Sequence, residues 1–211
     1  MAEPRTTIHL VRHGEVHNPE SVLYERLPGY HLSERGRRMA ERVADHFARA
    51  GAPPVDLMLA SPLERAQETA APIAEALGLE VRREPRVIEA GSSLAGQRVN
   101  MPALLKPKAL VRLHNPFKPS WGEPYNRIAE RMHAVLAEVR REIPGGRAVI
   151  VSHQSPIWRA RLRAEGKSLW PMPRGRLCSL ASVTSLVYQG DRLSAVGYYE
   201  PAGDLLPEHL R

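Results

Sequence analysis

Four short apolar segments of this chain are each followed directly by side chains that could bind or transfer a phosphoryl group. These side chains are Arg12 and His13, the segment Ser61–Arg65, Glu89, and His153 with Gln154. Each apolar segment has the length of a buried strand. Because ligands bind beyond the carboxyl ends of the strands in open α/β sheets, we expect these side chains to surround one pocket.

His13 is the candidate nucleophile of this pocket. An imidazole that donates one ring N–H keeps a lone pair on its other nitrogen, and that lone pair can attack phosphorus. Gly14 would let backbone and ligand approach closely. The guanidinium group of Arg12 would neutralise the phosphoryl oxygens, which otherwise repel the lone pair. The alternative is that His13 is a structural, hydrogen-bonding histidine.

Three further side chains extend this prediction. Arg65 lies in the first turn of a predicted helix, where the helix N-terminus and the guanidinium both favour an anion. His153 follows its strand as His13 does and could donate to the same phosphate. Glu89 fits a general acid that protonates a leaving alkoxide and then accepts a proton from water. A surface arginine, a core histidine and a loop carboxylate are the alternative interpretations.

The elements that would position these residues alternate between strand and helix. Apolar and β-branched runs predict strands at Thr7–Val11, Val55–Ala60 and Ala148–Ser152 and a strand contained within Arg82–Ile88, followed by a hairpin of Ser182–Tyr188 and Leu193–Tyr199. Helical periodicity and capping signals predict helices from Ser33 to Gly51, from Ser61 toward Gly78, from Pro124 to Pro144, and from Ser155 onward. This pattern predicts a three-layer α/β/α fold with a mainly parallel central sheet and a C-terminal hairpin.

Composition sets the broad class of the protein. The 211 residues are 43% hydrophobic and 25% charged, which favours one globular domain spanning residues 1–211. No apolar run is long enough for a membrane-spanning helix or a secretory signal, and the single cysteine, Cys178, cannot form an internal disulfide. We therefore expect a cytoplasmic protein without a membrane partner. The oligomeric state cannot be read from the sequence.

The net charge of +7 is concentrated in two segments. Residues 90–122 hold five Lys and Arg and no Asp or Glu, and residues 157–176 hold six Lys and Arg against Glu165. Four prolines interrupt 90–122, which we interpret as a lid-like excursion with one short helix near residues 103–113. The two segments follow Glu89 and His153, so we expect them to flank one pocket mouth. The alternative is that they only keep two peripheral segments soluble.

The motifs resemble those of a known family. Leu10–Glu15 resembles the Arg-His-Gly signature of the histidine phosphatase superfamily, the phosphoglycerate mutase-like proteins. Ser61–Ala70 is similar to its second signature, Leu32–Gly36 to the start of its first helix, and Ser152–His153 to its second histidine motif. The resemblance covers roughly residues 7–90 and 122–160.

This resemblance implies a site and a chemistry. It implies that His13 is transiently phosphorylated, that Arg12, Arg65 and His153 form the phosphate pocket, and that Glu89 donates the proton. Asn18 and Gln154 are candidate substrate-binding residues. No metal or other cofactor is implied, and the chain has no cluster of ligands at metal-binding spacing.

The chain departs from the family pattern at two places. Asn18 comes one position earlier than the corresponding asparagine of many members. The segment Gly91–Gly96 keeps the glycines of a Gly-x-Trp-x-Gly segment but lacks its tryptophan. Glu15 and Glu123 therefore remain alternatives to Glu89 as the acid.

Three functions follow from this sequence. The first is a metal-independent phosphomonoesterase that forms a phosphohistidine on a small phosphorylated metabolite. The second is a phosphoglycerate mutase, which would use the same site but return the phosphoryl group to another oxygen. The third is a non-catalytic anion-binding protein. Nucleic acid is disfavoured as a partner because aromatic residues make up only 5% of the chain and no groove-reading or stacking motif is present.

Overall fold

One six-stranded sheet forms the centre of the protein, in the order β3-β2-β4-β1-β5-β6. The computed structural model describes residues 3–98, 122–169 and 176–208. The strands are β1 (Arg5–Arg12), β2 (Leu57–Ala60), β3 (Arg82–Arg83), β4 (Arg147–Ser152), β5 (Val183–Gln189) and β6 (Arg192–Tyr199). Strands β1 to β4 pair in parallel, whereas β5 and β6 form an antiparallel hairpin that joins the sheet beside β1.

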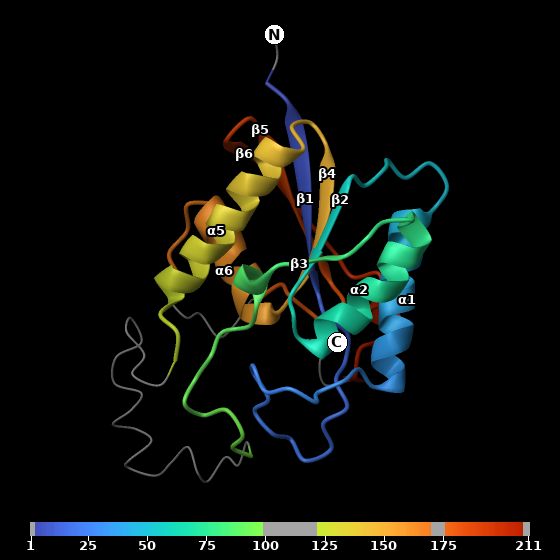
Figure 1. Ribbon diagram of the computed structural model, residues 1–211, viewed down its shortest axis with the longest axis vertical. Helices are drawn as coiled ribbons and strands as arrows, with labels where there is room; N and C mark the ends of the chain where they lie inside the picture. The colour runs from blue at the N-terminus through green and yellow to red at the C-terminus, as the bar shows by residue number, and fades with distance from the viewer. Residues whose placement is uncertain (1–2, 99–121, 170–175, 209–211) are drawn as a thin grey trace.

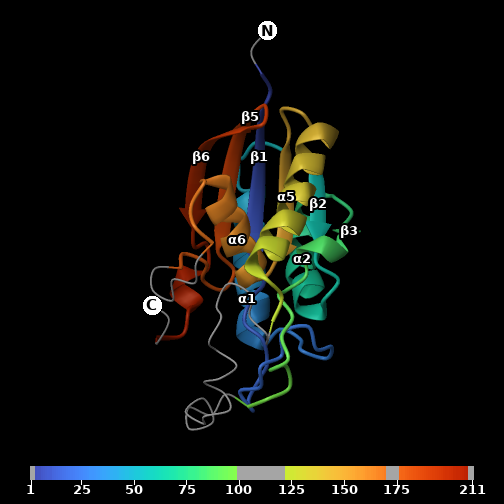
Figure 2. The same ribbon diagram turned by 90° about the vertical axis from the view of Figure 1, so that its left-hand side faces the viewer.

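Helices cover both faces of this sheet. The helices are α1 (Glu34–Ala48), α2 (Glu64–Leu77), α5 (Tyr125–Glu142) and α6 (Gln154–Ala164). Helices α1 and α2 pack together on one face, and α5 and α6 on the other, as Figure 1 shows. Figure 2 looks onto the face that α5 and α6 cover. The predicted three-layer α/β/α fold with a mainly parallel sheet and a C-terminal hairpin is confirmed.

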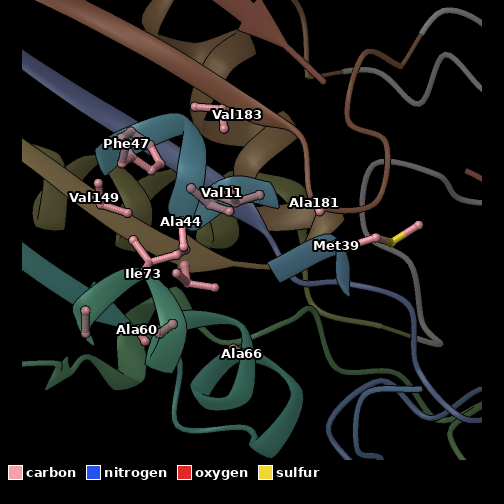
Figure 3. Close-up of a cluster of buried hydrophobic side chains, with 14 of the residues drawn as sticks. Val11, Met39, Ala44, Phe47, Ala60, Ala66, Ile73, Val149, Ala181 and Val183 are labelled. Carbon is pink, nitrogen blue, oxygen red and sulfur yellow. The ribbon is translucent and has the colours of Figure 1, made fainter. Parts of the chain in front are cut away.

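Alternation along the strands supplies a core to each face. On β1, Ile8 and Leu10 pack with Met132 of α5 in the core under α5 and α6. Val11 of the same strand packs with Phe47 of α1 in the core under α1 and α2, part of which Figure 3 shows. All five side chains are at least 96% buried. Because successive side chains of a strand point to opposite faces, a strand buried on both sides must be apolar at nearly every position.

Three helix starts were predicted from serine caps, and one is confirmed. The Ser33 hydroxyl accepts the Gly36 N–H at 3.0 Å and caps α1. The prediction that Ser61 caps α2 was wrong, because α2 begins at Glu64, and the Ser61 hydroxyl bonds to a distant histidine instead. The prediction that Ser155 caps α6 was also wrong, since Ser155 lies inside the first turn and His153 holds the capping position.

The strand predicted within Arg82–Ile88 is present as β3, but it is only two residues long. Only Arg82 and Arg83 pair with β2, and Pro85–Val87 form a 3-10 turn. Pro85 has no N–H for a sheet ladder. In addition, the Glu84 carboxylate accepts the backbone N–H of Arg86 and caps the turn. A second 3-10 turn spans Gly203–Leu205 near the C-terminus.

The predicted excursion at about 90–122 is described only at its two ends. Residues 99–121, which include the predicted short helix, lie outside the described residues. An isolated β-bridge pairs Arg98 with Val22, and a second pairs Ser92 with Gly122, so the two ends of the excursion lie side by side. Within the described parts of the chain, none of the helices combines the length and apolar character needed to cross a bilayer.

Candidate active site

The register of the parallel strands brings the predicted residues to one edge of the sheet. Arg12 on β1 is the partner of Ser152 on β4, and Ala60 on β2 is the partner of Val151 on β4. The residues that follow these strand ends are His13, Ser61 and His153. The ladder continues into them, because His13 N–H donates to the Ser152 carbonyl at 3.1 Å and Ser61 N–H to the Val151 carbonyl at 2.9 Å.

His13 is buried and held in one tautomer. Its Nδ1 lies 2.7 Å from the carbonyl oxygen of Gly14, which can only accept, so Nδ1 carries the proton and Nε2 has the lone pair. Burial and the positive charges of Arg12 and Arg65 lower the pKa of His13 well below 6.5. The imidazole is therefore neutral near pH 7, as a nucleophile must be.

The ring of His153 lies beside that of His13, with 5.1 Å between the ring centroids. Nε2 of His153 lies 2.7 Å from the Ser61 hydroxyl. The Ser61 oxygen also accepts a long hydrogen bond from Leu63 N–H, so the Ser61 hydroxyl can donate its own hydrogen bond to Nε2 of His153. Burial is the largest of the effects that lower the pKa of His153 well below 6.5. A neutral ring that accepts at Nε2 carries its proton on Nδ1.

Two arginines flank the histidines, each fixed by a backbone carbonyl. Arg12 donates to the carbonyl of Cys178 at 2.7 Å. Arg65, whose side chain is fully buried, donates to the carbonyl of Glu25, and its guanidinium lies over the Tyr24 ring at 4.8 Å from the centroid. Glu25 has φ 31°, in the left-handed region that non-glycine residues rarely adopt, which marks a strained position beside the site.

Several buried donors of these residues have no partner among the described residues. They are Nε of Arg12, Nε and one terminal nitrogen of Arg65, and Nδ1 of His153. A buried donor without a partner costs about 1–3 kcal/mol, so proteins rarely bury several together without a ligand to receive them. Such a group of buried donors suits an anion with several oxygens, such as phosphate.

Glu89 and His13 line one cleft, and the pKa of Glu89 is raised above the usual value. Burial raises the pKa, whereas the N–H of Ala90, which donates to Oε1 at 2.7 Å, and the charges of Arg12 and Arg65 lower it in part. The backbone carbonyl of Glu89 accepts from Arg26 at 2.7 Å and holds the residue in place. A raised pKa favours the protonated form that a general acid requires.

The residues surround a cleft of about 330 Å³, which we call the His13 cleft. Its walls combine the Arg-His-Gly motif and the residues next to the second histidine motif with the loop between β1 and α1. The lining residues are Arg12, His13, Val22, Leu23, Tyr24, Glu25, Glu89, Ala90, Gln154 and Ser155. Arg65 and His153 lie behind this lining, fully buried. A cleft of this volume accommodates a small phosphorylated metabolite.

Of the other candidate substrate-binding residues and alternative acids, only Gln154 lines this cleft. Gln154 lines the His13 cleft, but Asn18 does not, because its amide group closes the surrounding loop through two hydrogen bonds to the backbone of Val22. Glu15 accepts from the Ser33 hydroxyl at 2.6 Å at the start of α1. Glu123 pairs with Arg26 at 2.6 Å and also with Arg131. Neither Glu15 nor Glu123 lines this cleft.

A second, smaller cleft of about 190 Å³ adjoins the first and shares Glu25, Ala90 and Ser155 with it. Arg159 and Arg176 line this adjoining cleft, as does Gly122. The described ends of both basic segments therefore meet at one place next to the His13 cleft. The lysines and arginines at 106–118 and Arg174 lie outside the described residues.

Several features of this site were not predicted from the sequence. Ser61 was predicted to lie at the same sheet edge as His13 and His153, but its hydroxyl was assigned to a helix cap, and its hydrogen bond to His153 was not predicted. No role was predicted for Tyr24 or Glu25. The roles of these two residues depend on a loop conformation that carries no periodic pattern. Among the described residues, no group of three His, Cys, Asp or Glu could hold a metal ion.

Comparison with known proteins places this site in a family. The model of the histidine phosphatase superfamily (branch 1) matches residues 8–201 of the chain. An uncharacterised protein of Mycobacterium tuberculosis is 51% identical over 199 residues, which cover 93% of this chain and 97% of that protein.

The names of two further relatives refer to a phosphatase and to a phosphoglycerate mutase. A protein named phosphoserine phosphatase 1 from Hydrogenobacter thermophilus is 34% identical, covering 70% of this chain and 71% of its own. A protein named probable phosphoglycerate mutase from Escherichia fergusonii is 30% identical, covering 94% of this chain and 93% of its own.

The fold is shared with solved structures. The structure of a mycobacterial glucosyl-3-phosphoglycerate phosphatase superimposes with a TM-score of 0.73 at 24% identity, covering 92% of this chain and 96% of that one.

Proposed function

Since this chain belongs to the histidine phosphatase superfamily, we propose that it is a metal-independent phosphomonoesterase that acts on a small phosphorylated metabolite through a phosphohistidine. The observation that carries this proposal is the set of unpartnered buried donors of Arg12, Arg65 and His153 beside the ring of a neutral His13. These donors are where a phosphoryl group would bind.

The phosphoryl group is bound first. Its non-bridging oxygens accept from Nε of Arg12, from the two unpartnered nitrogens of Arg65, and from Nδ1 of His153. Charge-assisted hydrogen bonds of this kind are stronger than neutral ones, and they act here in a site shielded from water. They also withdraw negative charge from the face of the phosphorus that His13 must approach.

His13 then attacks. The Nε2 lone pair forms an N–P bond while the bond from phosphorus to the leaving oxygen breaks, and the carboxyl proton of Glu89 goes to that oxygen. The positive charge that develops on the ring is stabilised through Nδ1–H and the Gly14 carbonyl, 2.7 Å away. The products of this half are the free alcohol and the phosphohistidine.

Water completes the reaction. The Glu89 carboxylate accepts a proton from a water molecule, whose oxygen attacks phosphorus as the N–P bond breaks. Inorganic phosphate leaves, His13 regains its lone pair, and Glu89 is again protonated. Each residue returns to its starting state, so no cofactor is consumed.

The adjoining cleft supports a leaving group that carries negative charge. The guanidinium of Arg159 lies 3.7 Å from the centroid of the Tyr125 ring and is buried, and its Nε has no partner among the described residues. Arg176 lies on the same cleft, at the surface. Glu25 and Glu123 also line it, but their carboxylates already accept from Ser92 and from Arg26 and Arg131. A carboxylate or second phosphate on the leaving group would therefore bind between the two arginines.

The experiment that tests this proposal traps the intermediate. Protein mixed with a 32P-labelled phosphomonoester and quenched in alkali should retain label that acid removes, as a phosphohistidine does. His13→Ala should show no label and no hydrolysis of an aryl phosphate, whereas His17→Ala, which removes a nearby exposed histidine, should keep both. Unchanged activity in EDTA is expected. Hydrolysis by the His13→Ala variant would contradict the mechanism.

A phosphoglycerate mutase is the second candidate, and the 30% identical relative named a probable mutase favours it. A mutase would use the same steps but return the phosphoryl group to a second oxygen of the bound substrate instead of to water. A coupled mutase assay with a bisphosphate primer distinguishes the two. Mutase turnover faster than phosphate release would overturn our assignment, and binding of the phosphomonoester with neither labelled His13 nor turnover would indicate the non-catalytic alternative.

A further inference from the structure

A second polar cleft lies at the opposite end of the sheet from His13. It has a volume of about 560 Å³ and is lined by Arg5 and Arg147 at the amino ends of β1 and β4, by His9 in the middle of β1, and by His46 and Arg49 at the end of α1. We call it the Arg147 cleft. In Figure 1 the amino ends of β1 and β4 lie at the upper end of the sheet, near the N-terminus, whereas the loop between β1 and α1 lies at the lower end.

The lining of this cleft is cationic. Arg5, Arg49 and Arg147 all line it, and no Asp or Glu does. The Asp56 carboxylate accepts the backbone N–H of Arg147 at 2.8 Å and not its guanidinium. Within the described ranges, none of the salt bridges involves any of these three arginines.

Arg147 is held rigidly in this cleft. One terminal nitrogen donates to the carbonyl of Pro53, and the other donates to Nε2 of His9 at 2.9 Å. His9 in turn donates from Nδ1 to the Ser185 hydroxyl at 2.8 Å. Burial and the neighbouring charges of Arg147 and His46 lower the pKa of His9 to about 3, so His9 remains a neutral acceptor. A cation fixed in this way loses little further entropy when it binds an anion.

The grouping of these charges is unfavourable without a counter-ion. Burial, first, and then the charge of Arg49 lower the pKa of both His46 and Arg147, whereas the charge of Asp56 raises that of Arg147 in part. Isolated surface arginines are screened by solvent and need no explanation. Three arginines around a concave surface, one of them fixed and partly buried, repel one another more strongly, and a bound anion would relieve this repulsion.

We propose that the Arg147 cleft is a second binding site, separate from the His13 cleft, for a small organic molecule that carries at least two phosphate charges. Its volume lies within the range of about 300–1,000 Å³ that is usual for small-molecule sites. The ring of Tyr199, which is 55% exposed and lies 5.9 Å from the ring of His46, supplies a flat wall for the uncharged part of the molecule. This proposal does not depend on the chemistry of His13.

The test is calorimetric titration with methylenediphosphonate, whose P–C–P bridge cannot be hydrolysed. The double variant Arg5→Gln/Arg49→Gln removes two exposed charges from the cleft and leaves the Arg147 hydrogen bonds intact. The matched control, Arg37→Gln/Arg38→Gln, removes two exposed charges from the other end of α1. The wild type and the control should show one more binding event than the cleft variant, or at least tenfold tighter binding. All three proteins should hydrolyse an aryl phosphate equally.

Three outcomes would overturn the proposal. The cleft variant could bind the same number of probe molecules with an affinity within twofold of the control. The control could lose as much binding as the cleft variant, which would indicate non-specific attraction to net charge. Sedimentation could show a wild-type dimer that the cleft variant dissociates, which would make the cleft an interface between copies. In support, the ring signals of His46 in NMR spectra should shift when the probe is added to the wild type.

Discussion

The backbones of Gly14 and Gly36 are in direct contact, and a Cβ atom on Gly14 would lie 2.5 Å from the carbonyl oxygen of Gly36. A Cβ atom on Gly36 would overlap the carbonyl oxygen of Glu15. The two glycines come from separate motifs, one beside the nucleophile and one in the first helix. Their contact packs the start of α1 against the loop that carries His13.

This contact predicts that Gly14→Ala and Gly36→Ala both destabilise the protein by about 1–3 kcal/mol, the usual cost of overpacking. Gly14→Ala should also reduce the rate of aryl phosphate hydrolysis, because the Gly14 carbonyl orients the His13 ring. Urea unfolding measures the first effect. Gly203→Ala is the control, since its Cβ would meet only ordinary contacts at 3.5 Å or beyond. A Gly36→Ala variant as stable as this control would contradict the prediction.

The role of Glu89 as the proton donor predicts a dependence on the leaving group. Glu89→Gln should lower kcat/KM for an alkyl phosphate by about 10²–10⁴-fold, the usual contribution of general acid catalysis. The loss for p-nitrophenyl phosphate should be much smaller, because nitrophenolate leaves without a proton. Glu15→Gln and Glu123→Gln are matched controls. If either shows this signature and Glu89→Gln does not, the acid is misassigned.

The same residues predict the pH profile. Glu89 must be protonated, so the rate falls as pH rises through its pKa, which burial raises above its usual value. His13 must be neutral, so the rate also falls at low pH, but only well below 6.5, because burial and the arginines depress its pKa. The Glu89→Gln variant should lose the alkaline limb and keep the acidic one. Steady-state rates for an alkyl phosphate between pH 4 and 9 would measure both limbs.

Arg176 predicts selectivity for charged leaving groups. Arg176→Gln should raise KM about twofold to fivefold for a phosphomonoester whose leaving group bears a carboxylate, since an exposed charge pair contributes up to about 1 kcal/mol. KM for a neutral alkyl phosphate should not change. Arg192→Gln removes an exposed charge at the far hairpin turn and should have no effect on either substrate. Equal changes for both substrates would remove Arg176 from the leaving-group site.

The lowered pKa of His9 leads us to expect a loss of stability in acid. Its pKa is about 3 in the folded protein because of burial and the nearby charges of Arg147 and His46, against 6.5 for an unperturbed histidine. The unfolded chain therefore binds the extra proton between these values, and the free energy of unfolding falls as pH decreases from about 6.5 toward 3. At pH values above 6.5 this contribution is fully present.

Urea unfolding at pH 7, 5.5 and 4.5 measures this effect. His9→Gln cannot take up the proton and should lose less stability than the wild type over this range, by up to about 1.4 kcal/mol per pH unit. The exposed His17, replaced in the same way, is the control and should behave as the wild type does. Identical slopes for His9→Gln and the wild type would contradict the prediction.

The local pattern of the sequence predicted most of the elements. The buried strands β1 and β4 were predictable because both of their faces must be apolar, and α1 because its cap and apolar stripe agree. The errors share one cause. Ser61 has the residue type of a cap, but its hydroxyl bonds to His153, and Arg82–Ile88 has the composition of a strand, but Pro85 interrupts the ladder. A distant contact or a missing donor overrode the local preference.

The sequence by itself determined which residues we propose for the chemistry, because Arg12, His13, Glu89 and His153 each follow an apolar run, and parallel strands present their ends at one edge. Only the tertiary structure decided how these residues are oriented. Ser61 sets the tautomer of His153, the carbonyl of Glu25 holds Arg65, and Arg147 meets His9 at the far end of the sheet. These pairs join segments that are far apart in the chain. Their hydrogen bonds depend on strand register and loop conformation, which local residue preferences do not specify.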